Sequence, residues 1–443
     1  MRVQLLDPSA FTPPYDRALA AALARAGADV ELVTSHFLYG PVPEPEGYRV
    51  REEFYRRTTR RGLEAPGRRA FKAAEHLVDI ATYRARERRR TVGPAPIGPP
   101  GHPAADPPRG APERPDADPA VGPPPDVVHH QWFTFPAVDG WLMSRGGRGR
   151  GVPQVATAHY ILPPRPNRRA VLAARSAFGR MDAVIAHSEQ GADRLRSEVG
   201  LDPARVHVVP HGVFDYLTNL PDEAPLPAEL TGEAPAASAV PSAAPADAGP
   251  TPAAGTADAL SAPADPARPV VLFFGLLRPY KGIDVLLEAF RSVPDAELWI
   301  AGNPRMPVEP LREAARGSAS PVRIAPRFIT DAEIPALMRR ADLVVLPYRD
   351  IEQSGVLYTA LAFGKPLVLT AVGGFPEVAE RTGAARLVPP GDPAALAATL
   401  NELIADPAAR AGLANAARTA ATGPYSWDRI AARTLDLYRS LLP

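Results

Sequence analysis

The sequence predicts two α/β domains, each a doubly wound parallel sheet with helices on both faces. A chain of 443 residues is too long for one compact core and suits two domains. Short apolar runs alternate with helical patterns in both halves, which is typical of parallel strands joined by helices. Ligands of such sheets bind beyond the carboxyl ends of the strands. We therefore expect two domains that face each other across a cleft.

The first half opens with the pattern of a βαβ unit. Residues 3–6 predict a strand, residues 17–26 a helix that ends at Gly27, and residues 30–34 a second strand. Four later apolar runs are short and bounded by Pro, Gly, Asp or His. They predict buried parallel strands over residues 127–130, 155–158, 183–186 and 206–209.

The second half repeats this alternation, with helices between the strands. The expected strands cover residues 270–274, 296–301, 322–325, 343–346, 366–370 and 385–388. The last helical pattern, residues 426–442, follows Gly423 and Pro424. It is expected either to cap the second domain or to return to the first.

Two stretches rich in Pro and Ala interrupt the pattern, residues 91–125 and 217–268. They contain almost no large apolar side chains, so we expect them to be disordered or loosely extended and to carry no chemistry. The first is an insertion within a domain. The resulting division is an N-terminal domain (1–215), a linker (216–268), a C-terminal domain (269–424) and a final helix (425–443).

Composition excludes several classes of protein. The formal net charge of +1 argues against a nucleic-acid binder, and no run is apolar and long enough to cross a membrane. The absence of cysteine excludes disulfides, thiolate catalysis and cysteine zinc sites. The N-terminus leads straight into a strand without a signal-peptide pattern. We expect a cytoplasmic protein.

The most informative segment is residues 275–290, where a turn joins a buried strand to an amphipathic helix. Such a unit directs backbone N–H groups and a helix N-terminus at an anion above the sheet. Arg278 and Lys281 add two cations there, which suits a diphosphate whose negative charge grows as it leaves a sugar. The alternative is a solvated turn.

The second half then carries an ordered set of motifs. They are Gly275-Leu-Leu-Arg278-Pro-Tyr-Lys281-Gly282, Ala341-Asp342-Leu-Val-Val-Leu-Pro347-Tyr348, Gln353-Ser354-Gly355-Val356, Gly364-Lys365-Pro366 and Gly373-Gly374-Phe-Pro376-Glu377. This set resembles the donor half of retaining glycosyltransferases of family 4 (glycosyl transferases group 1), which have two Rossmann-like domains in the GT-B fold. The first half agrees more weakly, through Thr157-Ala158-His159 and Val209-Pro210-His211-Gly212 among others.

The resemblance implies that a sugar moves from a nucleotide-diphosphate donor in the C-terminal domain to an acceptor in the N-terminal domain, with retention. The acceptor would be a hydroxyl of a glycan, a lipid or a small molecule. The resemblance implies no metal and no cofactor, because a basic pair and backbone amides neutralise the leaving group. Arg278 and Lys281 are the candidates for this pair, and His159 would face the donor sugar.

The donor site implied by the resemblance departs from the family pattern. Leu276 stands where many members have an arginine, and the two expected glutamate positions hold Ile351 and Thr359, with Glu352 one residue away. Either the Thr359 hydroxyl or Glu352 remains open for the ribose contact. The predicted donor-binding residues are Gly275, Arg327, Phe328, Glu352, Gln353, Ser354, Gly355, Val356 and Thr359.

On the acceptor side, Tyr15 and Asp16 follow the first strand, where prolines replace the usual glycines. Asp16 would bind an acceptor hydroxyl or cap the helix that begins at Arg17, and the cap is slightly favoured. His211 is open between a hinge or catalytic role and a structural one. Other histidines, among them His129 and His187, are expected to be structural, because their spacing does not predict a zinc site.

Residues 49–90 are rich in arginine. They predict a basic patch that is either a solvated face or a contact with an anionic membrane or polyanionic acceptor, which would place the protein on the inner face of the membrane. Two other functions remain open beside transfer. They are a GT-B sugar-nucleotide epimerase and a scaffold that has lost turnover.

Overall fold

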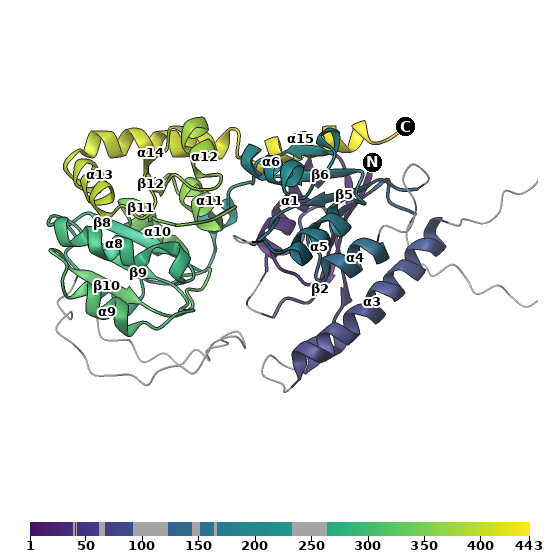
Figure 1. Ribbon diagram of the computed structural model, residues 1–443, viewed down its shortest axis with the longest axis horizontal. Coiled ribbons are helices and arrows are strands. Elements are labelled where there is room, and N and C mark those ends of the chain that lie inside the picture. Colours follow the sequence, from purple (N-terminus) through teal and green to yellow (C-terminus); the bar gives the residue numbers. More distant parts are fainter. Residues whose placement is uncertain are drawn as a thin grey trace, which may run out of the picture.

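The computed structural model describes residues 1–38, 40, 42–61, 67–91, 123–143, 151–163, 166–232 and 264–443. Two parallel sheets form two lobes that lie side by side (Figure 1). The first lobe contains a seven-stranded sheet of order β3-β2-β1-β4-β5-β6-β7, and the second a six-stranded sheet of order β10-β9-β8-β11-β12-β13. In each sheet the direction of winding reverses beside the first strand, so the predicted doubly wound α/β fold is confirmed.

The first lobe follows the predicted strands closely and adds β3. Its strands are β1 (Arg2–Asp7), β2 (Asp29–Ser35), β3 (Arg49–Phe54), β4 (Val127–His130), β5 (Gln154–Thr157), β6 (Ala183–Ala186) and β7 (Val206–Val208). Its helices are α1 (Pro13–Arg25), α2 (Arg56–Arg60), α3 (Arg68–Thr91), α4 (Pro136–Met143), α5 (Arg168–Phe178) and α6 (Glu189–Ser197).

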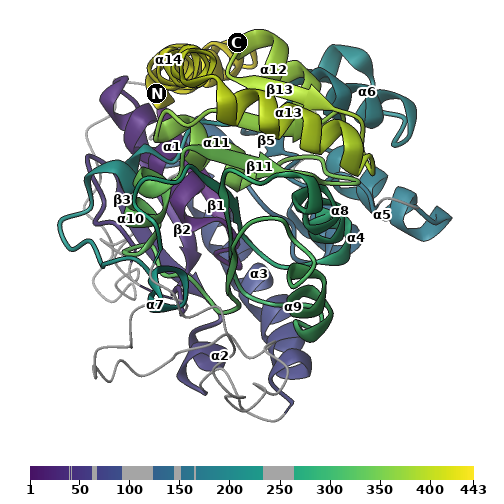
Figure 2. The same cartoon turned by 90° about the vertical axis from the view of Figure 1, so that its left-hand side faces the viewer.

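The second lobe has all six predicted strands: β8 (Val270–Phe274), β9 (Glu297–Ala301), β10 (Val322–Ala325), β11 (Leu343–Leu346), β12 (Leu367–Thr370) and β13 (Ala385–Val388). Its helices include α8 (Ile283–Ala289), α9 (Glu309–Ala315), α10 (Ile334–Arg340), α11 (Gly355–Ala362), α12 (Phe375–Thr382), α13 (Pro393–Ala405) and α14 (Pro407–Thr422). Figure 2 shows α8 and α9 on one side of this sheet and α10 and α11 on the other.

The start of α1 corrects one expectation. The helix begins at Pro13 rather than Arg17, because proline lacks the N–H that the first turn leaves unpaired and its φ already suits a helix. Asp16 therefore lies in the first turn and is not the N-cap. The N-cap is Thr12, whose side chain makes no capping hydrogen bond.

The linker prediction is wrong for residues 217–232, which are packed. Leu217 and Leu230 are 3% and 0% exposed in the core of the second lobe, and the Tyr216 hydroxyl donates to Asp331 at 2.8 Å. Residues 228–231 form the short helix α7 (Ala228–Thr231). Residues 92–122 of the predicted insertion and 233–263 of the predicted linker lie outside the described residues.

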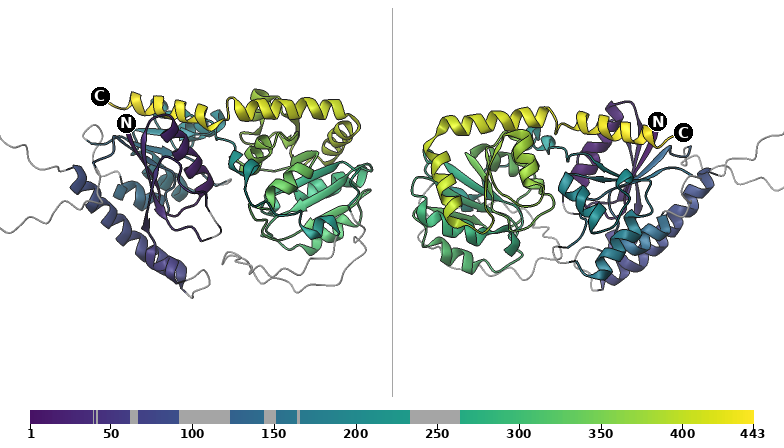
Figure 3. Two further views of the ribbon diagram at one scale, coloured as in Figure 1. Left: turned by 180° about the vertical axis from the view of Figure 1, so that it is seen from behind. Right: turned by 45° about the horizontal axis from the view of Figure 1, so that its top comes forward.

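The last helix, α15 (Trp427–Ser440), leaves the second lobe and packs on α1 of the first. In Figure 3 it continues the line of α14 along one side of both lobes. Trp427, Ile430 and Leu435 are at most 3% exposed and belong to the same apolar cluster as Leu19 of α1. The chain thus crosses between the lobes twice, at residues 209–217 and again at 423–427.

Candidate functional site

Lys281 lies where the second sheet reverses its direction of winding, beyond β8 and beside the end of β11. Its side chain is 8% exposed, and its ammonium donates to the Tyr348 hydroxyl at 2.9 Å and lies 4.6 Å from the centroid of that ring. The Ser354 hydroxyl is 3.4 Å from the same phenol oxygen. Within the described residues Lys281 has no carboxylate partner. A buried ammonium without a counter-ion is suited to an incoming anion.

Two glycines hold the backbone tightly around this ammonium. Gly275 has φ of +119°, and a Cβ there would lie 3.3 Å from Lys281 Nζ and 3.1 Å from Val356 Cγ2. Gly282 has φ of +66°, and a Cβ there would lie 1.9 Å from the Pro347 carbonyl oxygen. The loops after β8 and β11 can therefore approach each other only with glycine at both positions.

The predicted turn at 353–356 leads into α11 beside Lys281. Ser354 is 5% exposed at the N-cap position of α11, and its side chain makes no capping hydrogen bond. The Gln353 side-chain oxygen accepts from the Tyr358 hydroxyl at 2.6 Å. Gly355, the first residue of α11, packs close to Phe214. The turn therefore places a helix N-terminus and the Ser354 hydroxyl next to the buried ammonium.

Three other predicted donor residues differ in what their side chains offer. Thr359 is 4% exposed and donates its hydroxyl to the Gly355 carbonyl at 3.0 Å, so this hydroxyl is directed within its own helix rather than at a ribose. Arg327 is held by Glu229 at 2.8 Å and Glu333 at 2.6 Å. Phe328 is 42% exposed and available for contact.

Arg278, the other half of the predicted basic pair, is exposed. Among the described residues its side chain forms no hydrogen bond or ion pair. The structure therefore does not bring Arg278 and Lys281 into one buried pair. Lys281 is fixed in place, whereas Arg278 stands at the rim of the same loop.

Glu352 reaches across to the first lobe. Its carboxylate accepts the backbone N–H of Ile161 at 2.7 Å and of Leu162 at 3.4 Å, and it forms an ion pair with Arg194 of α6. The side chain is 17% exposed. Burial raises the pKa of Glu352, and the two N–H groups and Arg194 oppose that rise. If Glu352 held the donor as predicted, a donor hydroxyl would have to compete with these three partners for the carboxylate.

His159 follows β5, as predicted, and lies in a cluster of rings. Its imidazole stacks on Trp132 with centroids 5.1 Å apart and meets the edge of Tyr15 at 4.6 Å. Nδ1 lies 3.2 Å from Nε2 of His187, and Nε2 lies 3.2 Å from the side-chain oxygen of Gln131. Burial, and next the neighbouring histidines, hold the pKa of His159 well below its ordinary value. The ring is therefore neutral at physiological pH.

The hydrogen bonds assign the tautomer of His187. Its Nδ1 lies 3.0 Å from the Val209 carbonyl oxygen and must carry the proton, since a carbonyl only accepts. Nε2 of His187 therefore presents a lone pair to Nδ1 of His159. Nε2 of His159 faces a second acceptor, Oε1 of Gln131, so a neutral His159 ring can donate to one of these two neighbours and not to both.

Tyr15 and Asp16 are buried, and their predicted contact with an acceptor stays a prediction. Tyr15 is 2% exposed and is surrounded by His159, His211 and Trp427. Asp16 is 1% exposed and lies beside the carboxyl of Asp7, whose oxygens accept backbone N–H groups of the loop after β1. Burial, followed by the charge of Asp7, raises the pKa of Asp16 well above its usual range.

His211 lies between the lobes. Its ring stacks on Tyr358 of the second lobe, with centroids 4.3 Å apart and planes 10° apart, and its Nδ1 lies 2.6 Å from the Gly212 carbonyl oxygen. Next to it, the Trp427 indole donates to the Val213 carbonyl at 2.7 Å. A Cβ at Gly212 would fall within 2.5 Å of the Trp427 ring. These contacts place His211 at the crossing between the lobes, and its hinge or catalytic role stays a prediction.

Sequence analysis missed Lys72 of α3, beside the loop after β1. Its ammonium lies 4.4 Å from the ring centroid of Tyr55 and 5.8 Å from that of Phe11, without a carboxylate partner among the described residues. The hydroxyls of Ser9 and Thr134 lie 2.7 Å apart near Tyr55. Burial, and next Arg68, lower the pKa of Lys72. One feature of the sequence could have drawn attention to Lys72: lysine is rare in this chain and occurs at residues 72, 281 and 365 alone.

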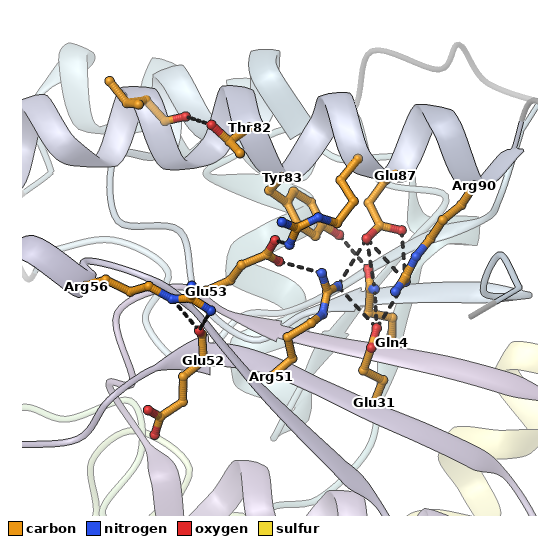
Figure 4. Close-up of polar contacts among 12 residues, drawn as sticks. Gln4, Glu31, Arg51, Glu52, Glu53, Arg56, Thr82, Tyr83, Glu87 and Arg90 are labelled. Carbon is orange, nitrogen blue, oxygen red and sulfur yellow. Dashed lines mark hydrogen bonds and ion pairs between the residues drawn. The ribbon is translucent and has the colours of Figure 1, made fainter. Parts of the chain in front are cut away.

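Several arginines of the predicted basic patch are paired within the first lobe (Figure 4). Arg51 lies 2.7 Å from Glu53 and 3.1 Å from Glu87, and Arg90 lies 3.2 Å from Glu31. Gln4 and Tyr83 join the same network through a hydrogen bond of 2.5 Å. These pairs tie α3 to β1, β2 and β3. Membrane attachment through residues 49–90 stays a prediction, which binding to anionic vesicles tests.

No helix in the ranges given above is both long and apolar enough to span a bilayer. No group of three or more His, Asp or Glu side chains in the same ranges is arranged to hold a metal ion.

Loops at the carboxyl ends of both sheets thus meet at one place, with a buried ammonium on one side and a neutral histidine on the other. Two facing α/β lobes with such a junction define the GT-B class. Family models agree: "Glycosyl transferases group 1" matches residues 268–406, and "Glycosyltransferase Family 4" matches residues 68–214. The D-inositol 3-phosphate glycosyltransferase of Xylanimonas cellulosilytica is 30% identical over 331 residues, which cover 71% of each chain.

Solved structures show the same fold. Sucrose-phosphate synthase of Thermosynechococcus elongatus has a TM-score of 0.64 at 18% identity, covering 100% of this chain and 99% of that one. Anabaena HepE in complex with UDP-glucose has a TM-score of 0.61 at 17% identity, covering 99% and 100%. The chain belongs to the family 4 glycosyltransferases (glycosyl transferases group 1), and it is an enzyme of that family.

Proposed function

We propose that this enzyme transfers a sugar from a nucleotide-diphosphate donor to an acceptor hydroxyl, with retention of the anomeric configuration and without a metal ion. The observation that carries the proposal is the Lys281 ammonium, which is buried, hydrogen-bonded to Tyr348 and without a carboxylate partner in the described part of the chain. A diphosphate would supply the missing negative charge. The UDP-glucose complex of Anabaena HepE, which shares the fold, supports a uridine diphosphate donor.

In the proposed reaction, the bond between the anomeric carbon and the β-phosphate oxygen breaks, and its electron pair goes to the phosphate. The acceptor oxygen forms its bond to the same face of the sugar, and its proton passes to the departing phosphate. Glu352 is occupied by Ile161, Leu162 and Arg194, which argues against a covalent carboxylate intermediate at this loop. The work of the protein is positioning and stabilisation of charge.

Lys281 and the N-terminus of α11 would neutralise the diphosphate as it departs. A fixed ammonium and backbone N–H groups need no reorganisation when charge develops, so they can replace a divalent ion. The neutral imidazole of His159 would contact a hydroxyl of the donor sugar. Arg278 at the rim adds a second positive charge.

We further propose that the acceptor carries an anionic group held at Lys72. The D-inositol 3-phosphate glycosyltransferase to which the chain is 30% identical is named for an acceptor with a phosphate. Lys72, Ser9 and Thr134 offer an unpaired ammonium and two hydroxyls at the end of β1. Loss of Lys72 should raise KM for a phosphorylated acceptor and leave donor binding unchanged, and no change in that KM would refute the assignment.

A donor panel tests the proposed function. Each nucleotide-sugar is titrated into the protein by calorimetry with EDTA present, and the product formed from the bound donor is examined by NMR. Saturable binding of one donor and an anomeric coupling that matches the donor's support the proposal. An inverted product, or binding that disappears with EDTA, overturns the corresponding part of it.

A further inference from the structure

Glu352 joins the two loops that carry the candidate site. It precedes Gln353 and Ser354 in the loop after β11, beside Lys281. Its carboxylate accepts N–H groups of Ile161 and Leu162, which follow His159 by two and three residues. One side chain therefore connects the loop at the ammonium with the loop at the histidine.

Arg194 strengthens this connection from α6. Its guanidinium contacts Glu352, and it is also held by Glu198 of the same helix at 2.8 Å. The side chains of Arg194 and Glu352 are 19% and 17% exposed, so solvent screens the pair only in part.

A second carboxylate of the second lobe contacts the same helix. Glu377 of α12 accepts the backbone N–H of Glu189, the first residue of α6, at 2.7 Å. Arg381 holds Glu377 at 3.0 Å. The second lobe therefore supplies two carboxylates, Glu352 and Glu377, and the first lobe supplies backbone N–H groups that donate to them.

We propose that Glu352 is a positioning residue that sets the distance between the His159 loop and the Lys281 site, and that it does not bind the donor. This inference rests on the proposed function of the site. The carboxylate already has three donors, and a sugar hydroxyl would have to displace one of them. Misplacement of reacting groups by about 1 Å can cost about a hundredfold in rate.

Kinetics separates positioning from direct binding. Glu352→Ala should lower kcat between about tenfold and a hundredfold while the donor Kd changes by less than about threefold. Glu352→Gln keeps an oxygen for one N–H group but loses the charge, so its kcat should fall between wild type and Glu352→Ala. The matched control is Glu198→Gln, which removes the other partner of Arg194 and should leave kcat within about twofold.

A distance measurement gives a second readout. The chain has no cysteine, so Ala204→Cys in the first lobe and Ala394→Cys in the second place two spin labels at exposed positions. In the double-labelled protein, Glu352→Ala should broaden the distance distribution between the labels and Glu198→Gln should not. An unchanged distribution together with unchanged kcat would overturn the inference.

The outcomes also distinguish this inference from the proposed function. If wild type binds no nucleotide-sugar, the proposed function fails, whereas the label distances still report whether Glu352 joins the lobes. If wild type binds a donor and Glu352→Ala raises Kd as much as it lowers kcat/KM, then Glu352 is a donor ligand and the positioning role is wrong.

Discussion

The ammonium of Lys281 lies 2.9 Å from the hydroxyl of Tyr348 and over its ring, although the two residues are 67 positions apart. Tyr348 is fully buried and cannot neutralise a cation. The Lys281 ammonium is therefore held in a fixed position that is largely shielded from water. Such an arrangement suits an anion that is present only when substrate is bound, which is the role proposed for Lys281.

Replacing Lys281 should mainly lower the rate of transfer. Lys281→Ala removes one fixed cation from the leaving group, which should cost about 3 kcal/mol in the transition state, or about two decades in kcat. Tyr348→Phe keeps the cation and should cost less than about tenfold. The measurement is the initial rate of transfer at saturating donor. Near-normal turnover in Lys281→Ala would rule out a role for Lys281 in stabilising the leaving group.

Gly282 should be intolerant of any side chain. Gly282→Ala would place a Cβ 1.9 Å from the Pro347 carbonyl oxygen at φ of +66°, so it should destabilise the fold by more than about 1 kcal/mol and reduce donor binding. Gly391→Ala is the matched control, because Gly391 has φ of +75° but no atom within 4 Å. Chemical denaturation measures the free energy of unfolding of both variants. Gly391→Ala reports backbone strain alone, whereas Gly282→Ala adds steric overlap. An equal loss of unfolding free energy in the two variants would contradict the close contact between Gly282 and Pro347.

Stability should fall as the pH is lowered from 7 towards 4. Burial lowers the pKa of His187 to about 4 and of His129 to about 3, so both stay neutral in the native state while the unfolded chain takes up protons below about pH 6.5. Below that pH, each of these two histidines lowers the free energy of unfolding by about 1.4 kcal/mol per pH unit. Burial raises the pKa of Asp16 well above its usual range, so this group acts in the opposite direction and offsets part of the loss. Denaturation at several pH values should give a shallower slope for His187→Asn than for wild type.

The segment 233–263 should be dispensable. Its flanks already meet, because the Ala264 N–H donates to the Thr231 carbonyl at 2.9 Å. Replacing residues 235–261 by a short Gly-Ser linker should change the free energy of unfolding by less than about 0.5 kcal/mol and leave turnover unchanged. Loss of turnover in a folded deletion variant would mean that the segment contributes to the reaction.

The strands and the Lys281 loop could be predicted because their signals are local. Each strand of the second sheet is mostly apolar, and glycines mark the turns around Lys281. The partners of Glu352 could not be predicted, since Ile161 lies 191 positions away and a backbone N–H has no residue signature. Burial of Tyr15 depends on α15, which returns from the far end of the chain. Leu217 and Leu230 fill the second core from a segment whose composition resembles a linker.

The most direct test of the account is the release of nucleoside diphosphate from a bound nucleotide-sugar in the presence of EDTA, compared between wild type and Lys281→Ala. The account predicts metal-independent release by wild type and a loss of about two decades in the variant, with donor still bound. Release that requires added metal, or equal rates in the two proteins, would contradict it.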